Sequence, residues 1–376
     1  MVDVLRGLNL LQSLKESMES NKLSEVKDAV EDLLISRINL AIVGDRVEEK
    51  ISFINSLHGL CPGDEGAARS SSAVDTDDVV CYPNPKHTDF RLWDLPPVPQ
   101  LSPFEPETFM DRVKFARYNA VFMTFTQTLT PGVVEVFLQA RSLQQHTVYL
   151  TFLVSGNDKD KNLEEKRRAS VEMLTSKGVS QPKVYLVRPS ALETLDFPAL
   201  LEDMTKDLPE IRSCALLMAL PTLTTTLVSQ KKEAFKALVW AAASISGGMS
   251  TIPVPFVASM VDSSVAVRIL SKAQASLCLD DASVERLARQ RGVEPLSLKA
   301  LRACTLSVEV TKGEVKSRLA AAEKDLPSIS SKLMQMAVPR HARSAGRSFS
   351  ATLHALNAAI DDMAADAEKI LASAFG

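Results

Sequence analysis

Residues 38–52 read INLAIVGDRVEEKIS, and they indicate the fold class of the chain. Its first six residues are a short apolar run that ends at Gly44, which is the pattern of a buried β-strand. The residues after Gly44 stand where this strand meets the first helix of an α/β unit. A junction of this kind is where P-loop proteins carry the phosphate-binding motif G-x-x-x-x-G-K-S/T.

The motif at this junction is incomplete. Gly44 and Lys50 keep its spacing, whereas Glu49 replaces the second glycine. A carboxylate about 4 Å from a phosphate opposes binding by about 4 kcal/mol at an effective dielectric near 20. Ile51 replaces the hydroxyl residue that binds Mg²⁺, and Ser52 lies about 100° further around the helix. We therefore expect impaired phosphate and Mg²⁺ binding. Taken alone, the match is also typical of an ordinary strand–turn–helix with a surface lysine.

The alternation of elements predicts the fold class. Further short apolar runs predict strands at 90–95, 120–125, 148–154 and 184–187, and helices are predicted at 131–145 and 163–177. Strands that alternate with helices imply a mainly parallel sheet covered on both faces.

Helical patterns flank this α/β part on both sides. Residues 1–36 show helical spacing, and after residue 209 the strand signals vanish. Helices are then predicted at 222–240, 265–277, 282–290, 296–303 and 313–326, with a last one from about Ser348. We expect three parts: an N-terminal helical arm (1–36), an α/β domain (37–209) and an all-α C-terminal domain (210–376).

Composition narrows the functional classes. The net charge of −3 disfavours a nucleic-acid binder that depends on a broad basic surface. Five scattered cysteines without metal-like spacing fit a reducing compartment, and the N-terminus has no signal peptide, so we expect a cytoplasmic protein. The histidines are isolated from one another in sequence and predict structural roles. No catalytic residue and no metal site is predicted.

One uncharged stretch, residues 237–261, is long enough to span a bilayer. Its glycines at 247 and 248, its prolines at 253 and 255 and its many alanines favour a buried helix–turn–helix instead. A membrane-embedded protein remains the alternative at this point.

Several motifs follow the first junction in a fixed order. They are SFINSL at 52–57 with Gly59, EGAA at 65–68, WDLP at 93–96, DFP at 196–198, DLP at 207–209, ALP at 219–221 and VERLA at 284–288. In this order and spacing they resemble the immunity-related, or interferon-inducible, GTPases over nearly the whole chain. The resemblance implies a Ras-like P-loop GTPase domain joined to a helical domain built from N- and C-terminal helices.

The departures from the family pattern are concentrated where nucleotide would bind. Asp94 of the D-x-x-G element is present, but Pro97 replaces its glycine and has no N–H to donate to a phosphate. The guanine-reading element appears as SGND at 155–158, where Gly156 replaces the lysine and Asp158 retains its carboxylate. Thr76 is interpreted as either a remnant of the switch threonine or an ordinary loop residue. The resemblance thus implies a degenerate nucleotide site made of Gly44, Lys50, Ser52, Asp94 and Asp158.

The chain looks most like the degenerate Q-type quasi-GTPase branch, on CPGD at 61–64 and DMAADAE at 362–368. The resemblance implies a regulatory or adaptor pseudo-GTPase in innate defence or autophagy, with little or no GTP hydrolysis. It also implies protein partners among autophagy or immune proteins or related GTPases, and peripheral contact with intracellular membranes. The alternative is a GTP- or GDP-binding member with weak residual hydrolysis.

Two segments offer partner surfaces. The last helix carries an apolar stripe suited to packing against this protein's own helices or against another protein. The stripe consists of Phe349, Leu353, Leu356, Ile360, Met363, Ala367 and Ile370. The polar face of the same helix is predicted to carry Asp361, Asp362, Asp366 and Glu368. The tetrad FPAL at 197–200, preceded by acids, fits either an adaptor motif of autophagy receptors or the protein core.

Overall fold

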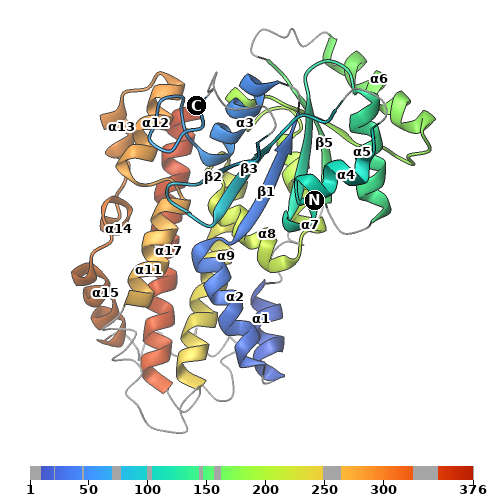
Figure 1. Ribbon diagram of the computed structural model, residues 1–376. Helices are drawn as coiled ribbons and strands as arrows, with labels where there is room; N and C mark the ends of the chain where they lie inside the picture. The colour runs from blue at the N-terminus through green and yellow to red at the C-terminus, as the bar shows by residue number, and fades with distance from the viewer. Residues whose placement is uncertain are drawn as a thin grey trace. The chain divides into compact units, whose positions relative to one another are not determined.

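The computed structural model describes residues 10–20, 22–44, 46–69, 78–99, 104–143, 147–155, 162–248, 264–324 and 346–375 (Figure 1). The chain divides into two compact units. One is Ser36–Leu216, which we call the α/β unit, and the other, the helical unit, combines Met1–Ile35 with Leu217–Gly376.

The α/β unit is built on a six-stranded sheet among the described residues, with the order β2-β3-β1-β4-β5-β6. The strands are β1 (Ile38–Val43), β2 (Val80–Pro83), β3 (Phe90–Leu95), β4 (Ala120–Phe125), β5 (Thr147–Leu153) and β6 (Val184–Val187). Only the pairing of β2 with β3 is antiparallel. The predicted mainly parallel sheet is confirmed, whereas the sequence patterns missed the short edge strand β2.

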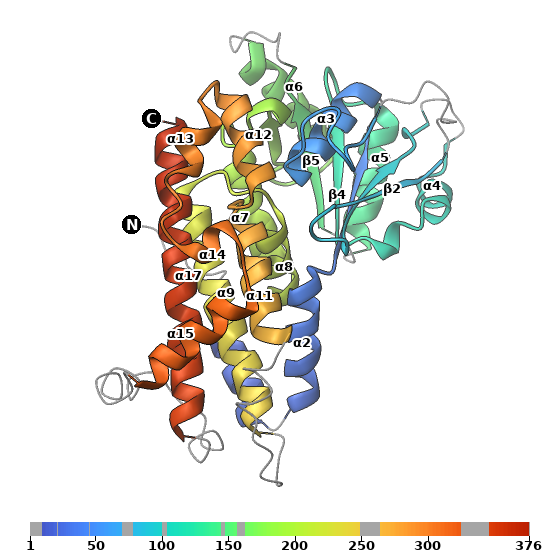
Figure 2. The ribbon, with the colours of Figure 1, turned by 90° about the vertical axis from the view of Figure 1, so that its left-hand side faces the viewer.

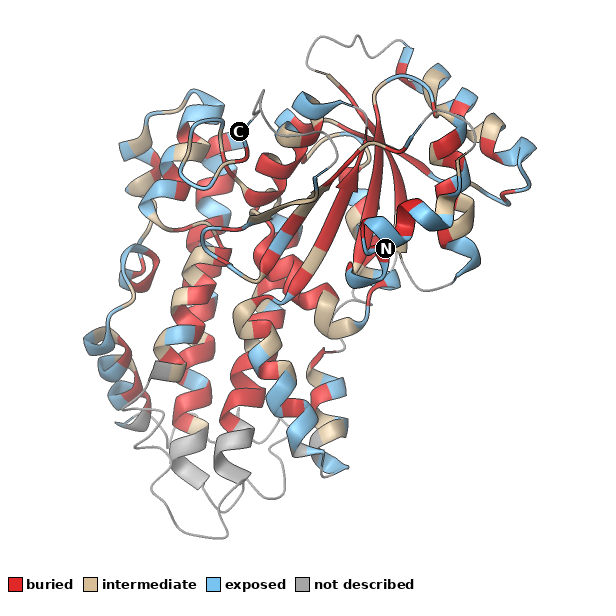
Figure 3. Cartoon of the chain, viewed as in Figure 1, coloured by how far each residue is buried: buried red, intermediate tan, exposed pale blue. Residues whose placement is uncertain are grey.

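Helices cover both faces of this sheet, because successive side chains of a strand point to opposite faces. The helices are α3 (Val47–His58), α4 (Pro106–Arg112), α5 (Pro131–Ser142), α6 (Leu163–Ser176) and α7 (Phe197–Asp207), and α8 (Glu210–Ala219) follows them. Every residue of the central strand β4 is buried (Figure 3). Phe122 packs edge-on against Phe53 of α3, whereas Val121 and Met123 belong to the core with Phe137 of α5.

The helical unit combines α1 (Leu10–Glu19) and α2 (Leu23–Ile35) with the C-terminal helices. These are α9 (Thr225–Gly248), α11 (Ser264–Ser276), α12 (Asp281–Arg291), α13 (Pro295–Lys299), α14 (Thr305–Val308), α15 (Lys312–Lys324) and α17 (Gly346–Phe375). The long helices α9 and α17 run side by side (Figure 2). No described helix is long and apolar enough to cross a membrane. Of the uncharged stretch, residues 249–261 lie outside the described part.

Apart from Phe349, whose side chain lies outside the described part, the apolar stripe of α17 packs inside its own unit. Leu353, Leu356, Ile360, Met363, Ala367 and Ile370 are all buried. One prediction for this helix is wrong, because Asp366 is only 1% exposed and does not lie on a solvated polar face. It accepts hydrogen bonds from Cys304 N (2.8 Å) and Ser307 Oγ (2.9 Å), so it anchors the short helix α14 to α17.

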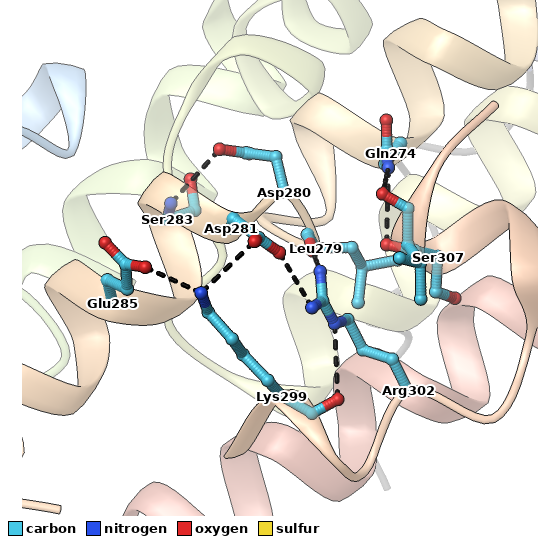
Figure 4. A network of polar contacts seen from close by, with 10 residues as sticks. Gln274, Leu279, Asp280, Asp281, Ser283, Glu285, Lys299, Arg302 and Ser307 are labelled. Atoms are coloured by element: carbon cyan, nitrogen blue, oxygen red, sulfur yellow. Dashed lines mark hydrogen bonds and ion pairs between the residues drawn. The ribbon is translucent and has the colours of Figure 1, made fainter. Parts of the chain in front are cut away.

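The family-like segment 284–288 lies in α12, inside a network of polar contacts (Figure 4). Asp280 caps α12 by accepting a hydrogen bond from Ser283 N at 3.1 Å. Asp281 pairs with both Arg302 (2.7 Å) and Lys299 (3.1 Å), and the second cation belongs to α13. This network ties the start of α12 to the chain around α13.

The tetrad at 197–200 belongs to the core of the α/β unit. Phe197 is 3% exposed and Leu200 is fully buried, and both side chains belong to α7. A receptor cannot reach these two anchor positions in the folded chain, so the core interpretation holds.

Candidate nucleotide site

The first junction, between β1 and α3, lies at the edge where the parallel strands end. Val43 is opposite Leu95 of β3 and Met123 of β4, so the carboxyl ends of three strands meet there. Ligands of open α/β sheets bind at this edge. It is therefore the place where a nucleotide site is expected.

Gly44 is required there by the packing of the sheet. A Cβ on this residue would lie 2.2 Å from Oγ1 of Thr124 and 2.8 Å from its carbonyl oxygen. The same Oγ1 donates a hydrogen bond to the carbonyl of Val43 at 3.0 Å, which joins β1 and β4. The first glycine of the motif thus has a structural reason to be present whether or not a phosphate binds.

Helix replaces the second half of the phosphate-cradling loop, from Val47 on. In a P-loop the backbone N–H groups of the residues between the two glycines cradle the phosphates. Here α3 begins at Val47, so Val47, Glu48 and Glu49 are already helical. The N–H of Lys50 donates to the carbonyl of Arg46 at 3.1 Å, which is an ordinary helical bond. This N–H is committed within the helix and is not presented to a ligand.

The first turn of α3 also carries its own negative charge. Glu48 is exposed and Glu49 is half-buried, and both lie in the first turn. Carboxylates at this place complement the positive end of the helix dipole, which is the attraction that P-loops use for phosphate. An incoming polyanion would meet these two charges instead of an open helix terminus.

Lys50 points into the protein. Its side chain is 5% exposed, its Nζ lies 2.6 Å from Oδ1 of Asp94, and it donates to the carbonyl of Leu95 at 2.9 Å. The structure therefore brings together two of the predicted site residues, but as partners of each other. The interpretation of Lys50 as a surface lysine is wrong.

The other predicted residues do not complete a phosphate or magnesium site. Ile51 is half-buried, and Ser52 is exposed, with its carbonyl accepting from Ser56 Oγ. Pro97 is half-buried and has no N–H. Asp158 and Gly156 lie outside the described residues, as does Thr76. Within the described part, no group of three or more His, Cys, Asp and Glu side chains could hold a metal ion.

Sequence reasoning missed the role of Asn55, which lies on the buried face of α3. Its Nδ2 donates to the carbonyl of Ala68 at 3.0 Å, and its Oδ1 accepts from the N–H of Ala68 at 2.7 Å. This side chain satisfies both backbone groups of a buried residue and so fixes the EGAA segment against α3. The asparagine of SFIN was the available signal, but the sequence alone did not show what it contacts.

A cavity of about 920 Å³ opens at the opposite edge of the sheet. Residues at the amino ends of strands line it, among them Asn119 before β4 and Lys183 before β6, together with Asp203 of α7. Lys183 Nζ and Tyr185 OH each donate to the carboxylate of Asp203 at 2.6 Å. Lys50 lies at the carboxyl ends of the parallel strands and the cavity at their amino ends. The cavity is therefore a different place from the site around Lys50.

Comparison with known proteins places this geometry in context. The model of the family described as Interferon-inducible GTPase (IIGP) matches residues 7–129 and 152–374. The chain is 28% identical over 389 residues to Interferon-inducible GTPase 5 of Bos taurus, with 98% of this chain and 82% of that protein covered. It is 23% identical over 292 residues to Interferon-inducible GTPase 1 of Mus musculus, with 74% and 70% covered.

Among solved structures, the chain is similar to a variant of Aquifex aeolicus Era bound to GDP.AlF4−. The identity is 14%, the TM-score is 0.31, and the match covers 46% of this chain and 56% of that chain.

Proposed function

The chain belongs to the interferon-inducible GTPase family, and we propose that it serves there as a regulatory or adaptor pseudo-GTPase in innate defence or autophagy. In this proposal it has little or no GTP hydrolysis and acts by binding other proteins. The observation that carries the proposal is the start of α3 at Val47, with the ammonium of Lys50 committed to Asp94.

Three independent features support the loss of turnover. The second half of the loop that would cradle phosphate is helical, and the first turn of that helix holds Glu48 and Glu49. Ile51 offers no oxygen for Mg²⁺. Pro97 stands where the D-x-x-G glycine would donate its N–H, and no side-chain rotation restores that donor. Each feature removes a different phosphate or magnesium contact.

The setting of this function is part of the proposal, and membership of the family supports it. We propose protein partners among immune or autophagy proteins or related GTPases, and a cytoplasmic location with peripheral contact with intracellular membranes. Because the stripe of α17 is buried in its own unit, its deletion would damage the core. Partner capture should therefore use the full chain.

Calorimetric titration with GTP, GDP and ATP in the presence of Mg²⁺ tests the loss of nucleotide chemistry. We expect no binding heat, no thermal shift and no phosphate release. Micromolar binding accompanied by turnover would contradict the proposal. A Glu49→Gln variant is the matched control, because it removes one carboxylate of the α3 first turn and leaves the helix start in place.

A second candidate is a GTP- or GDP-binding protein with weak hydrolysis. It is favoured by Lys50 and Asp94, which lie 2.6 Å apart at the sheet edge where nucleotides bind. Under this hypothesis, Lys50 leaves Asp94 when nucleotide arrives. Weak turnover by the unaltered chain would establish this candidate, and its absence would exclude it.

A further inference from the structure

The segment that follows β3, residues 95–99, is held at its start. We call this segment, LPPVP, the strap. The carbonyl of Leu95 accepts a hydrogen bond from Lys50 Nζ at 2.9 Å, and the same ammonium lies 2.6 Å from the carboxylate of Asp94. One buried cation from α3 thus holds two consecutive residues at the end of β3.

The strap is also held at its far end. Val98 is 5% exposed and belongs to the core of the α/β unit together with Leu129 and Phe137. The carbonyl oxygen of Pro99 approaches α5 so closely that a Cβ on Gly132 would lie 2.6 Å from it. Side-chain atoms do not tolerate this distance from a backbone oxygen, so Gly132 makes room for the strap.

Between these two ends the strap has little conformational freedom. Pro96, Pro97 and Pro99 each have φ restricted to about −65°, and none of them has an N–H. Proline also lowers the entropy of the unfolded chain, which reduces the cost of ordering the segment. The strap is therefore stiff between two fixed ends.

We propose that Lys50 is a structural clamp that holds the strap on α5 with or without nucleotide, so that the α/β unit keeps one conformation. In GTPases the γ-phosphate and its Mg²⁺ order the switch segments, which are released after hydrolysis. Here the ion pair of Lys50 and Asp94 orders the segment after β3 instead. The inference deepens the proposed function and rests on it, because a unit that is not switched by GTP hydrolysis needs another contact to order this segment.

A double-mutant cycle tests whether Lys50 and Gly132 act on the same strap. The variants are Lys50→Met, Gly132→Ala and their combination, all in a Trp240→Phe background. Trp93 of the α/β unit is then the remaining tryptophan of the chain and reports on urea unfolding of that unit. If both changes release the strap, their combined effect on the unfolding constant is smaller than the product by about tenfold.

The matched control is Gly313→Ala in α15. Gly313 and Gly132 are both the second residue of a helix, but a Cβ on Gly313 would find no atom closer than 3.9 Å. We expect Gly313→Ala to combine with Lys50→Met as an independent change, within about twofold. Equal independence of the Lys50 and Gly132 changes would overturn the clamp. If Lys50→Met does not fold, Asp94→Asn takes its place in the same cycle.

Methyl NMR of Val98 separates the clamp from the proposed function. We expect the Val98 signals to be the same without nucleotide, with GDP and with GTP, each with Mg²⁺. A shift produced by GTP but not by GDP would overturn the clamp, even in the absence of turnover. Phosphate release with unchanged Val98 signals would contradict the proposed function and support the clamp.

Discussion

The first turns of α3 and α12 meet the same physical demand in different ways. The N-terminus of a helix leaves backbone N–H groups without partners and carries a partial positive charge. At α12 the demand is met by Asp280, whose carboxylate caps the helix, and by Asp281, which pairs with Arg302. That helix terminus is a closed structural network (Figure 4).

At α3 the cap position is occupied by Arg46, which makes no side-chain capping bond. Negative charge comes from Glu48 and Glu49 in the first turn, at the place where the resemblance to GTPases would put a phosphate. The comparison teaches that an anion site can be lost without leaving the helix terminus unsatisfied, because the chain supplies the anion.

The largest effect on stability is expected from Lys50→Met, which removes the buried ammonium at the first turn of α3. It leaves the largely buried carboxylate of Asp94 and the carbonyl of Leu95 without their donor. Breaking a buried ion pair by removal of one partner costs about 3 kcal/mol or more. Urea unfolding measures the loss, and the double change Lys50→Met with Asp94→Leu should recover a large part of it. An unchanged free energy of unfolding in the single variant Lys50→Met would show that the pair is not structural.

Acid should weaken the α3 region before it weakens α12. His58, in the last turn of α3, is buried, neither ring nitrogen has a partner among the described residues, and burial lowers its pKa to about 3. The unfolded chain therefore binds a proton below about pH 6.5 while the folded chain does not. Stability should fall as the pH drops below 6.5, by about 2 kcal/mol at pH 5.

The control for this acid effect is His58→Phe, which should remove most of the loss of stability between pH 6.5 and 5. At α12, hydrogen bonds from Arg302 and Lys299 lower the pKa of Asp281. The stability it contributes is present above its ordinary pKa and is lost only as the pH falls through the lowered value. An acid transition near pH 6 that persists in His58→Phe would place the sensitive group elsewhere.

Capping changes should have opposite signs at the two helices. Asp280→Ala removes the cap of α12 and should cost about 1 kcal/mol, whereas Arg46→Ser offers α3 a cap that it lacks and should stabilise it by about 0.5 kcal/mol. Thermal unfolding of the two variants side by side measures both effects. Changes in stability of the same sign in both variants would mean that α3 and α12 do not differ in their capping.

The smallest effect is expected at the exposed part of the α12 network. Lys299 pairs with Asp281 at 3.1 Å and with Glu285 at 2.6 Å, and both carboxylates are largely exposed. Exposed pairs stabilise a protein little and are screened by salt. Lys299→Ala should therefore shift the unfolding midpoint slightly at low salt and less at 0.5 M salt, in a comparison that uses urea at both salt concentrations.

The sequence predicted the sheet well, because short apolar runs between helices are a strong local signal. It missed β2, a short edge strand that is only half-buried and therefore lacks a continuous apolar pattern. It also placed Asp366 on a solvated face, since helical periodicity does not reveal that Cys304 and Ser307 bring their donors to it from a distant segment.

The sequence predicted which motif residues of the candidate site are replaced, but not the contacts that the site residues make. Glu49, Ile51 and Pro97 were recognised as replacements, because a motif is defined by residue types at fixed spacing and can be compared position by position. The pairing of Lys50 with Asp94, and the close approach of Thr124 to Gly44, depend on which strands become neighbours. Such contacts between residues far apart in the chain come from the fold and have no local pattern.

The early start of α3 has a consequence for anyone who wishes to engineer catalysis back into this chain. Reverting Glu49, Ile51 and Pro97 would restore the consensus letters, yet Val47 and Glu48 would still lie on a helical path. A cradle for phosphate needs those residues as loop, so the first turn of α3 would have to be unwound or the connection lengthened. Recovery of activity is thus a problem of backbone redesign, and point reversions alone should leave the protein inert.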